Sequence, residues 1–291
     1  MERAAGHARP PATQLSQANT PMKRFLVATA LLLACTVPAS AQSTYAAPKG
    51  DTLRFREVLQ GKVAITTPQG EIPVTIEMRS LIGVRRMAGD SAHAWYDSLS
   101  MVATSPAGEQ RPAADSVLRH PFRLSFDPRG RIRLMQAPTF PASFQGLSDL
   151  SHQFDDFFLR LPDKPLVVGL AWSDSAARRD STAERTASWS ANADYRVERD
   201  TVVAGQPALV ISMKQQIRIS GEGPVPNQPM RATSLLLGGD EGYFVFAPRA
   251  GRLLARRRTG KLDGDTFLRG GGQEMAMRQA YTYTSTLDAV P

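Results

Sequence analysis

Cysteine and histidine are scarce in this chain. The 291 residues include one Cys and four His, and the Cys lies at position 35. The absence of any cysteine after residue 41 excludes disulfides, thiolate nucleophiles and Cys-ligated metal centres from that part of the chain. His93, His120 and His152 lack the spacing of zinc peptidase motifs. We therefore expect no cofactor and no metal.

Long hydrophobic runs are also lacking, and the clearest one belongs to an export signal. Met22-Lys23-Arg24 forms a basic start, Phe25–Ala34 is apolar but too short to span a membrane, and Ala39-Ser40-Ala41 has the small-x-small pattern of a cleavage site. The pattern predicts a signal peptide over residues 22–41 and an exported, periplasmic or secreted bacterial protein. We expect translation to begin at Met22, which leaves residues 1–21 outside the protein as made.

Cys35 leaves a second interpretation of the leader open. Leu32-Leu33-Ala34-Cys35 resembles a lipobox, in which the Cys is lipidated and becomes the first residue. Leu33 is an uncommon neighbour for such a site, so we favour cleavage after Ala41.

The basic charge of the chain decreases once the leader is removed. Residues 1–41 hold four of the 35 Lys and Arg and one of the 27 Asp and Glu, so residues 42–291 keep 31 basic and 26 acidic side chains. The net charge changes from +8 to +5. Because an exported protein seldom meets DNA, we expect no nucleic-acid partner.

Period-2 alternation runs through the rest of the chain and predicts strands. Ile72, Val74, Ile76 and Met78 share one face of a strand that forms a hairpin with Lys62–Thr67. Pro73 cannot donate to a ladder, which indicates a sheet edge or a bulge. Similar alternation occurs at 53–55, 93–101, 122–126, 209–213, 217–219 and 281–283. The pattern predicts a mainly β fold of antiparallel curved sheets or a half-barrel.

Turn residues separate these strands. We predict turns at Asp127–Gly130, Gly205–Pro207 and Gly238–Gly242, and a flexible loop at Gly270–Gly272. Gly89-Asp90-Ser91 resembles the nucleophile block of secreted esterases, but no His follows His152 to complete such a site. A hairpin turn is the better interpretation of these residues.

One segment has helical spacing. Its apolar residues recur at intervals of three and four and predict a central amphipathic helix over residues 144–160 that packs on a sheet or covers a cavity: Phe144, Leu147, Leu150, Phe154, Phe157, Phe158 and Leu161. A faint repeat flanks this segment, because Phe126–Ile132 resembles Phe246–Leu253. We therefore expect one β-rich domain, residues 42–291, with two duplicated lobes (50–140 and 165–291) joined by the helix.

The segment from Leu161 to Trp172 carries a Leu-Pro-x-Lys-Pro motif followed by Gly-x-x-Trp. It resembles the central signature of an uncharacterised family of secreted bacterial β-rich proteins. That resemblance implies an exported β fold and supplies no catalytic residue.

The candidate binding residues fall into two groups. Phe154, Phe157, Phe158 and Trp172 are candidates for contact with an apolar ligand, although packing is the favoured role of Trp172. Arg252, Arg256 and Arg258 would share one strand face with Leu254 and form a basic stripe toward an anionic surface. A charged edge strand that discourages aggregation explains the same stripe.

These observations predict a non-enzymatic envelope protein that binds an apolar or amphipathic ligand between its sheets and the helix. The alternative is a structural or assembly partner of another envelope protein. A secreted hydrolase is a distant third hypothesis, since no nucleophile, base and orienting group can be assembled.

Overall fold

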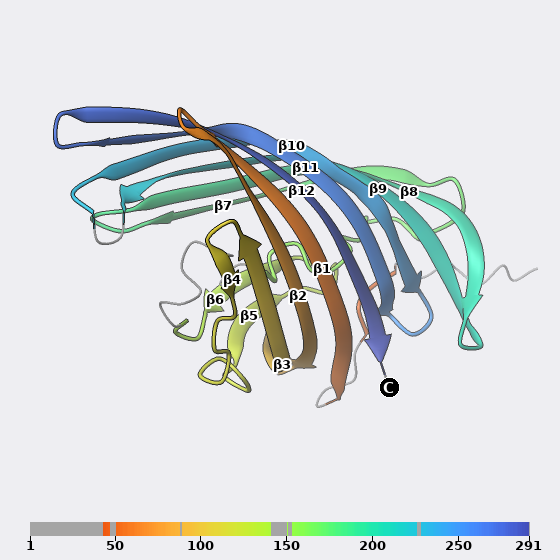
Figure 1. Cartoon of the computed structure of the whole chain (residues 1–291). Coiled ribbons are helices and arrows are strands. Elements are labelled where there is room, and N and C mark those ends of the chain that lie inside the picture. Colours follow the sequence, from red (N-terminus) through yellow and green to blue (C-terminus); the bar gives the residue numbers. More distant parts are fainter. Residues whose placement is uncertain are drawn as a thin grey trace, which may run out of the picture. The chain divides into compact units, whose positions relative to one another are not determined.

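The computed structural model describes residues 43–46, 51–87, 89–140, 150, 153–225 and 228–290, and the strands within them belong to one antiparallel sheet. Their order across the sheet is β6-β5-β3-β2-β1-β12-β11-β10-β9-β8-β7, and β4 pairs with β3 outside this path (Figure 1). The bounds are β1 Thr52–Thr67, β2 Gly70–Arg86, β3 Ser91–Ser105, β4 Gly108–Gln110, β5 Phe122–Phe126, β6 Ile132–Gln136, β7 Ala171–Ser181, β8 Thr186–Val203, β9 Gln206–Pro224, β10 Arg231–Ala247, β11 Arg252–Gly270 and β12 Gln273–Val290. The predicted mainly β, antiparallel architecture is confirmed.

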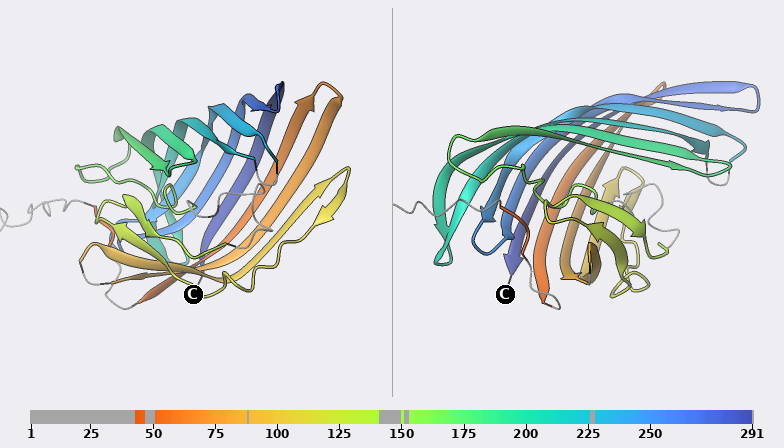
Figure 2. Two further views of the ribbon diagram at one scale, coloured as in Figure 1. Left: turned by 90° about the vertical axis from the view of Figure 1, so that its left-hand side faces the viewer. Right: turned by 180° about the vertical axis from the view of Figure 1, so that it is seen from behind.

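In several of the long strands, buried residues alternate with more exposed ones. In β1, Phe55 and Glu57 are buried whereas Arg54 and Arg56 are exposed. We call the face that carries Phe55 the inner face. The sheet curves around it, and the chain from residue 153 to the start of β7 lies beneath this curve (Figure 2). Alternation of apolar and polar residues therefore sets which face of the sheet turns inward.

The hairpin predicted from the first alternating segments is present as β1 and β2. Pro73 pairs with Ala64 of β1, and the pairing of β2 with β3 begins only at Thr75. Pro73 thus lies where its missing N–H costs no ladder bond to β3, as expected for a proline at a strand edge.

The predicted turn at Gly238–Gly242 is wrong, because β10 continues through it and pairs with β9 and β11. A Cβ atom at Gly242 would lie 1.9 Å from the carbonyl oxygen of Arg257, and one at Gly260 would lie 2.4 Å from the ring of Tyr283. These glycines allow neighbouring backbone and ring atoms to approach closely within a curved sheet. They are strand residues rather than turn residues.

The predicted central helix is not supported. Residues 153–158 form turns and bends, residues 159 and 160 have no regular structure, and residues 144–149, 151 and 152 lie outside the described part of the chain. Phe154, Phe157 and Phe158 are nevertheless buried in the core. Phe157 contacts the rings of both Phe154 and Phe158, and Phe157 and Phe158 contact the ring of Phe55. Residues 153–160, which we call the turn segment, pack against the sheet and bury three of the aromatic side chains that the helical spacing predicted to be buried.

The two repeat segments form equivalent turns, and residues 43–46 lie between them. Tyr45 contacts Phe126 and Phe246, at ring centroid distances of 5.4 and 5.2 Å. The Tyr45 N–H donates to the carbonyl of Pro128 in the β5–β6 turn, at 2.7 Å. The Ala46 N–H donates to the carbonyl of Gly251 in the β10–β11 turn, at 3.0 Å. The two repeat segments thus bind one short segment from both sides.

Strands from residues 50–140 and from 165–291 join in the same sheet through the pairing of β1 with β12. The origin of the two stretches as duplicated lobes stays a prediction. Within the described residues, no helix has the length and hydropathy needed to cross a membrane.

Candidate functional site

A buried ion pair links two strands that are not neighbours in the sheet. Arg256 of β11 donates from Nη2 to Oε1 of Glu57 of β1 at 2.7 Å, across the intervening strand β12. Their side chains are only 5% and 2% exposed. Ser285 of β12 also donates to Glu57, and Arg256 donates to the carbonyl oxygens of Asp156 and Phe157. The pair thereby fixes the turn segment against the inner face.

A second group of charges adjoins this pair. Arg258 forms an ion pair with Asp156 at 2.8 Å and donates from Nε to Asp240 at 2.7 Å. Tyr283 donates its hydroxyl to the same oxygen of Asp240, also at 2.7 Å. We call the whole set of three arginines and three carboxylates the buried charge network: Glu57, Asp156, Arg160, Asp240, Arg256 and Arg258.

The surroundings of Asp156 favour its charged form. Burial by itself raises the pKa of this carboxyl, but Arg258, Arg160 and a hydrogen bond from Gln215 outweigh burial, so the pKa lies below its usual value. Gln215 donates to Asp156 at 2.9 Å and accepts from Arg160 at 3.2 Å. Burial likewise opposes the charge of Arg258, yet its carboxylate partners hold its pKa above the usual value. Both partners stay ionised at neutral pH.

We expect this depressed pKa to appear in the acid stability of the protein. Asp156 is deprotonated in the native state at pH values where the unfolded chain, with a pKa near 3.9, already binds a proton. Its contribution is present above about pH 4 and is lost as the pH falls through the native pKa. Urea unfolding of Asp156→Asn below pH 4 should show a slope of stability with pH that is smaller by up to about 1.4 kcal/mol per pH unit. Parallel wild-type and variant curves would contradict this assignment.

A pocket of about 350 Å³ lies over the network on the inner face. Its polar side chains come from the network and its surroundings, including Gln153, Gln215, Tyr283 and Ser285, and Asp155 and Arg178 form an ion pair of 2.6 Å in its lining. The other lining side chains are apolar and come from β1, β2, β8, β9, β11 and the chain before the turn segment: Leu59, Met78, Leu150, Trp189, Ile217, Ile219 and Leu262. We call the apolar lining residues the wall of the pocket and the polar ones its floor. A mainly apolar lining with a few hydrogen-bonding groups is the usual composition of a small-molecule site.

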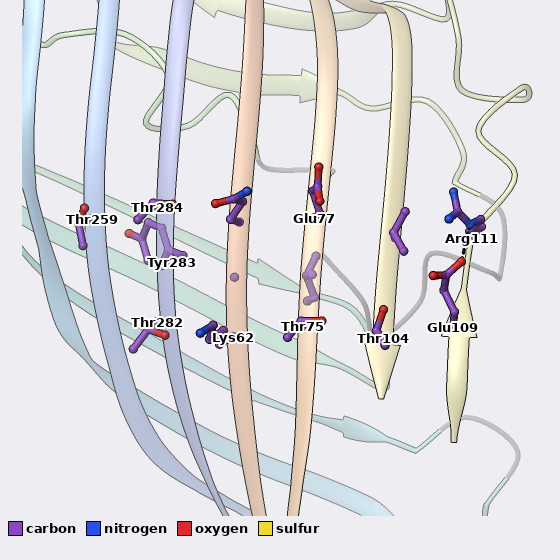
Figure 3. A pocket seen from close by; sticks show the side chains of 14 residues that line it. Lys62, Thr75, Glu77, Thr104, Glu109, Arg111, Thr259, Thr282, Tyr283 and Thr284 are labelled. Carbon is purple, nitrogen blue, oxygen red and sulfur yellow. Dashed lines mark hydrogen bonds and ion pairs between the residues drawn. The ribbon is translucent and has the colours of Figure 1, made fainter. Parts of the chain in front are cut away.

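A larger hollow of about 720 Å³ lies over strands β1, β2, β3 and β12 (Figure 3). Threonines and exposed charges line it, among them Lys62 and the ion pair of Glu109 with Arg111, at 2.5 Å. That pair is half exposed, and surface pairs of this kind contribute little energy. Buried polar residues line the inner pocket, including Glu57, Gln215 and Arg256, whereas none of the polar residues that line this hollow is buried. We therefore take the inner pocket as the candidate site.

The aromatic side chains proposed as ligand contacts are packed against the protein itself. Phe154, Phe157 and Phe158 have almost no exposed surface. Trp172 stacks on Tyr195 at a centroid distance of 5.1 Å and donates its indole N–H to the carbonyl of Arg160 at 3.0 Å. None of the four lines the inner pocket, so ligand contact at these residues remains a prediction.

The basic stripe does not form on the surface. A β-bulge in β11 leaves Leu254 without a pairing partner in β10, because Leu253 pairs with Phe246 and Ala255 pairs with Val245. Leu253 joins the main core, whereas Leu254 packs with Val245 in a separate cluster, so the bulge interrupts the alternation that was expected to carry Arg252, Arg256 and Arg258 on one face. Arg256 and Arg258 point inward to carboxylates, and Arg252 is half-buried. The exposed stripe is therefore corrected to a buried ionic network.

Sequence reasoning did not assign Glu57, Asp240 or Gln215 to the site. Glu57 does carry a readable signal, because it occupies an inward position between Phe55 and Leu59 in an alternating strand. A charge at an inward position predicts a buried partner. The identity of that partner depends on the neighbours in the sheet, which alternation does not give.

Comparisons with known proteins give no family for this chain. No family model matches it, and no curated protein matches it. Among solved structures, Neisserial surface protein A is 8% identical over 81% of this chain and 97% of that one, with a TM-score of 0.23. Pseudomonas aeruginosa OccK2 is 8% identical over 83% of this chain and 99% of its own, with a TM-score of 0.22. The translocator domain of the autotransporter NalP from Neisseria meningitidis is 7% identical over 83% and 90%, with a TM-score of 0.17. Likenesses with such TM-scores carry no argument about this chain.

Proposed function

We propose that this chain is an exported, non-enzymatic protein of the bacterial envelope that binds an amphipathic ligand in the inner pocket. The observation that carries the proposal is the meeting of an apolar wall with a buried polar floor in that pocket. Apolar surface removed from water would supply the affinity, at about 25 cal/mol per Å². The polar floor would fix the orientation of the ligand.

Export is the part of the proposal that rests on sequence alone. The basic start, apolar run and small-x-small site over residues 22–41 support it. Mass spectrometry of the protein from a bacterial envelope is expected to show a chain that begins at Gln42. A diacylated Cys35 as the first residue would instead establish a lipid anchor.

The alternative of an assembly partner that uses the arginine stripe has less support. Arg256 and Arg258 already hold carboxylates within the protein. Charge reversal at either position would therefore place like charges together in a buried site and disturb folding, rather than remove a surface contact.

Binding can be tested with the fluorescent probe N-phenyl-1-naphthylamine. Ile219→Lys places a charge in the pocket wall and is expected to weaken probe binding at least tenfold, about 1.4 kcal/mol. The matched control is Leu237→Lys, an apolar residue on neighbouring β10 that is 47% exposed and outside the pocket lining. We expect this control to bind like the wild type.

Thermal unfolding of both variants shows whether each still folds. Equal probe affinity in wild type and folded Ile219→Lys would exclude the inner pocket as the binding site. No probe binding by the wild-type protein would contradict the proposed function as a whole.

A further inference from the structure

The charged side chains around the inner pocket are paired with one another. This pairing limits which head group a ligand in the pocket can carry. Each arginine of the buried charge network lies within ion-pair distance of a carboxylate of the same network. Arg178 and Asp155 repeat the arrangement in the pocket lining, at 2.6 Å. Among the described residues that line the pocket, three arginines and three carboxylates therefore contribute no net charge.

From this balance we infer that the pocket takes a single-chain amphiphile with an uncharged, hydrogen-bonding head, such as a monoacylglycerol. The inference rests on the proposed function and specifies its ligand class. An anionic head would have to compete with Glu57 or Asp156 for an arginine, and a cationic head would have to compete with an arginine for a carboxylate. Either exchange would leave a buried charge without its partner, which is costly in a site of low polarity.

The polar floor also offers unused hydrogen-bonding capacity that suits a neutral head. The amides of Gln153 and Gln215 each use one N–H on a carboxylate, which leaves on each a second donor without an acceptor among the described residues. A hydroxyl or ester oxygen can accept from such donors without removing a carboxylate from its arginine.

The size of the pocket limits the apolar part of the ligand. A volume of about 350 Å³ is at the lower end of the range for small-molecule sites, about 300–1,000 Å³. A single acyl chain matches this space better than a lipid with two or more chains. The side chains that would contact the chain include Leu59, Met78, Ile217 and Ile219.

Competition with bound N-phenyl-1-naphthylamine tests the inference, with three ligands that share one chain length and are kept below their aggregation concentrations. Monomyristoylglycerol is expected to displace the probe at a concentration at least tenfold lower than myristate or tetradecylamine at pH 7. Myristate or tetradecylamine that competes equally well would overturn the neutral-head inference while binding itself stands. Failure of all three to displace the bound probe would refute both the inference and the proposed amphipathic ligand.

A charge variant provides an independent test. Asp155→Asn removes one carboxylate partner of Arg178, and the other, Asp180, lies outside the pocket lining. The lining then carries a net positive charge, so we expect the preference for monomyristoylglycerol over myristate to fall at least fivefold. Glu274→Gln is the matched control, because it makes the same change in net charge in an exposed pair with Arg269 outside the pocket. The control should keep the wild-type preference. An unchanged preference in folded Asp155→Asn, or an equal change in the control, would overturn the role of local charge balance.

Discussion

Arg256→Met is expected to lower the free energy of unfolding by about 3–5 kcal/mol, because it leaves the carboxylate of Glu57 buried without its ion partner. The change also removes the donors to the carbonyl oxygens of Asp156 and Phe157, which hold the turn segment on the sheet. Urea unfolding followed by circular dichroism would measure the loss.

The double variant Glu57→Leu/Arg256→Met separates the ion pair from the packing. Since it removes both charges together, it should be more stable than Arg256→Met alone, with a coupling energy of about 2 kcal/mol or more. Arg269→Ala is the matched control, because it breaks the exposed pair with Glu274 and should cost no more than about 1 kcal/mol. Equal losses for Arg256→Met and Arg269→Ala would show that the buried pair has no special role.

The inner face of the sheet could be predicted from the sequence because side chains alternate with period two in every strand. Ile76 and Met78 lie where alternation places them, and the β1–β2 hairpin has the expected partners. Alternation fails at Leu254 because a single extra residue in β11 changes which face the following side chains occupy. For this reason the sequence pattern predicts a surface stripe of arginines, whereas Arg256 and Arg258 lie in the buried charge network.

The glycines show a different limit of sequence reasoning. A run such as Gly238-Gly239 is typical of turns, since glycine adopts turn conformations at little cost. In β10 the same residues are extended, and they admit the close approach of neighbouring strands. Only the pairing across the sheet distinguishes the two uses, and a single sequence does not contain that pairing.

Part of the candidate site could be predicted from the sequence. The aromatic spacing over residues 154–161 correctly identified side chains that become buried, although the backbone there forms turns. The buried charge network joins residues from β1, β10, β11 and the turn segment, and Glu57 and Arg256 are 199 positions apart. Such a network depends on strand order, which no local pattern encodes.

Removal of the Tyr45 side chain is expected to cost about 3–5 kcal/mol of stability, the range for deletion of a large buried aromatic group. Tyr45 contacts Phe126, Phe158 and Phe246, so it connects the β5–β6 turn, the turn segment and the β10–β11 turn. Tyr45→Phe keeps the ring and should retain most of the stability. Chemical unfolding of Tyr45→Ala and Tyr45→Phe would establish whether residues 43–46 are an integral part of the fold.

A pair of glycines tests the same attachment from the side of the turn. Gly251 and Gly271 have nearly equal positive φ angles, 57° and 58°, so alanine brings about the same backbone strain of about 1 kcal/mol at either position. A Cβ atom at Gly251 would lie 2.4 Å from the nitrogen of Ala46, whereas one at Gly271 meets nothing within 4 Å. Gly251→Ala should therefore destabilise the protein by at least about 1 kcal/mol more than Gly271→Ala, within the 1–3 kcal/mol range of overpacked sites.

This excess should shrink when the Tyr45 ring is absent, because residues 43–46 are then held less firmly and can move away from the new methyl group. The double variant Tyr45→Ala/Gly251→Ala is thus expected to be more stable than the sum of the single losses, whereas Tyr45→Ala/Gly271→Ala should be additive. If both glycine variants cost the same in the wild-type background, residues 43–46 do not press on the β10–β11 turn in solution. Non-additivity confined to Gly251 would instead show that the energy of the turn depends on the segment that it binds.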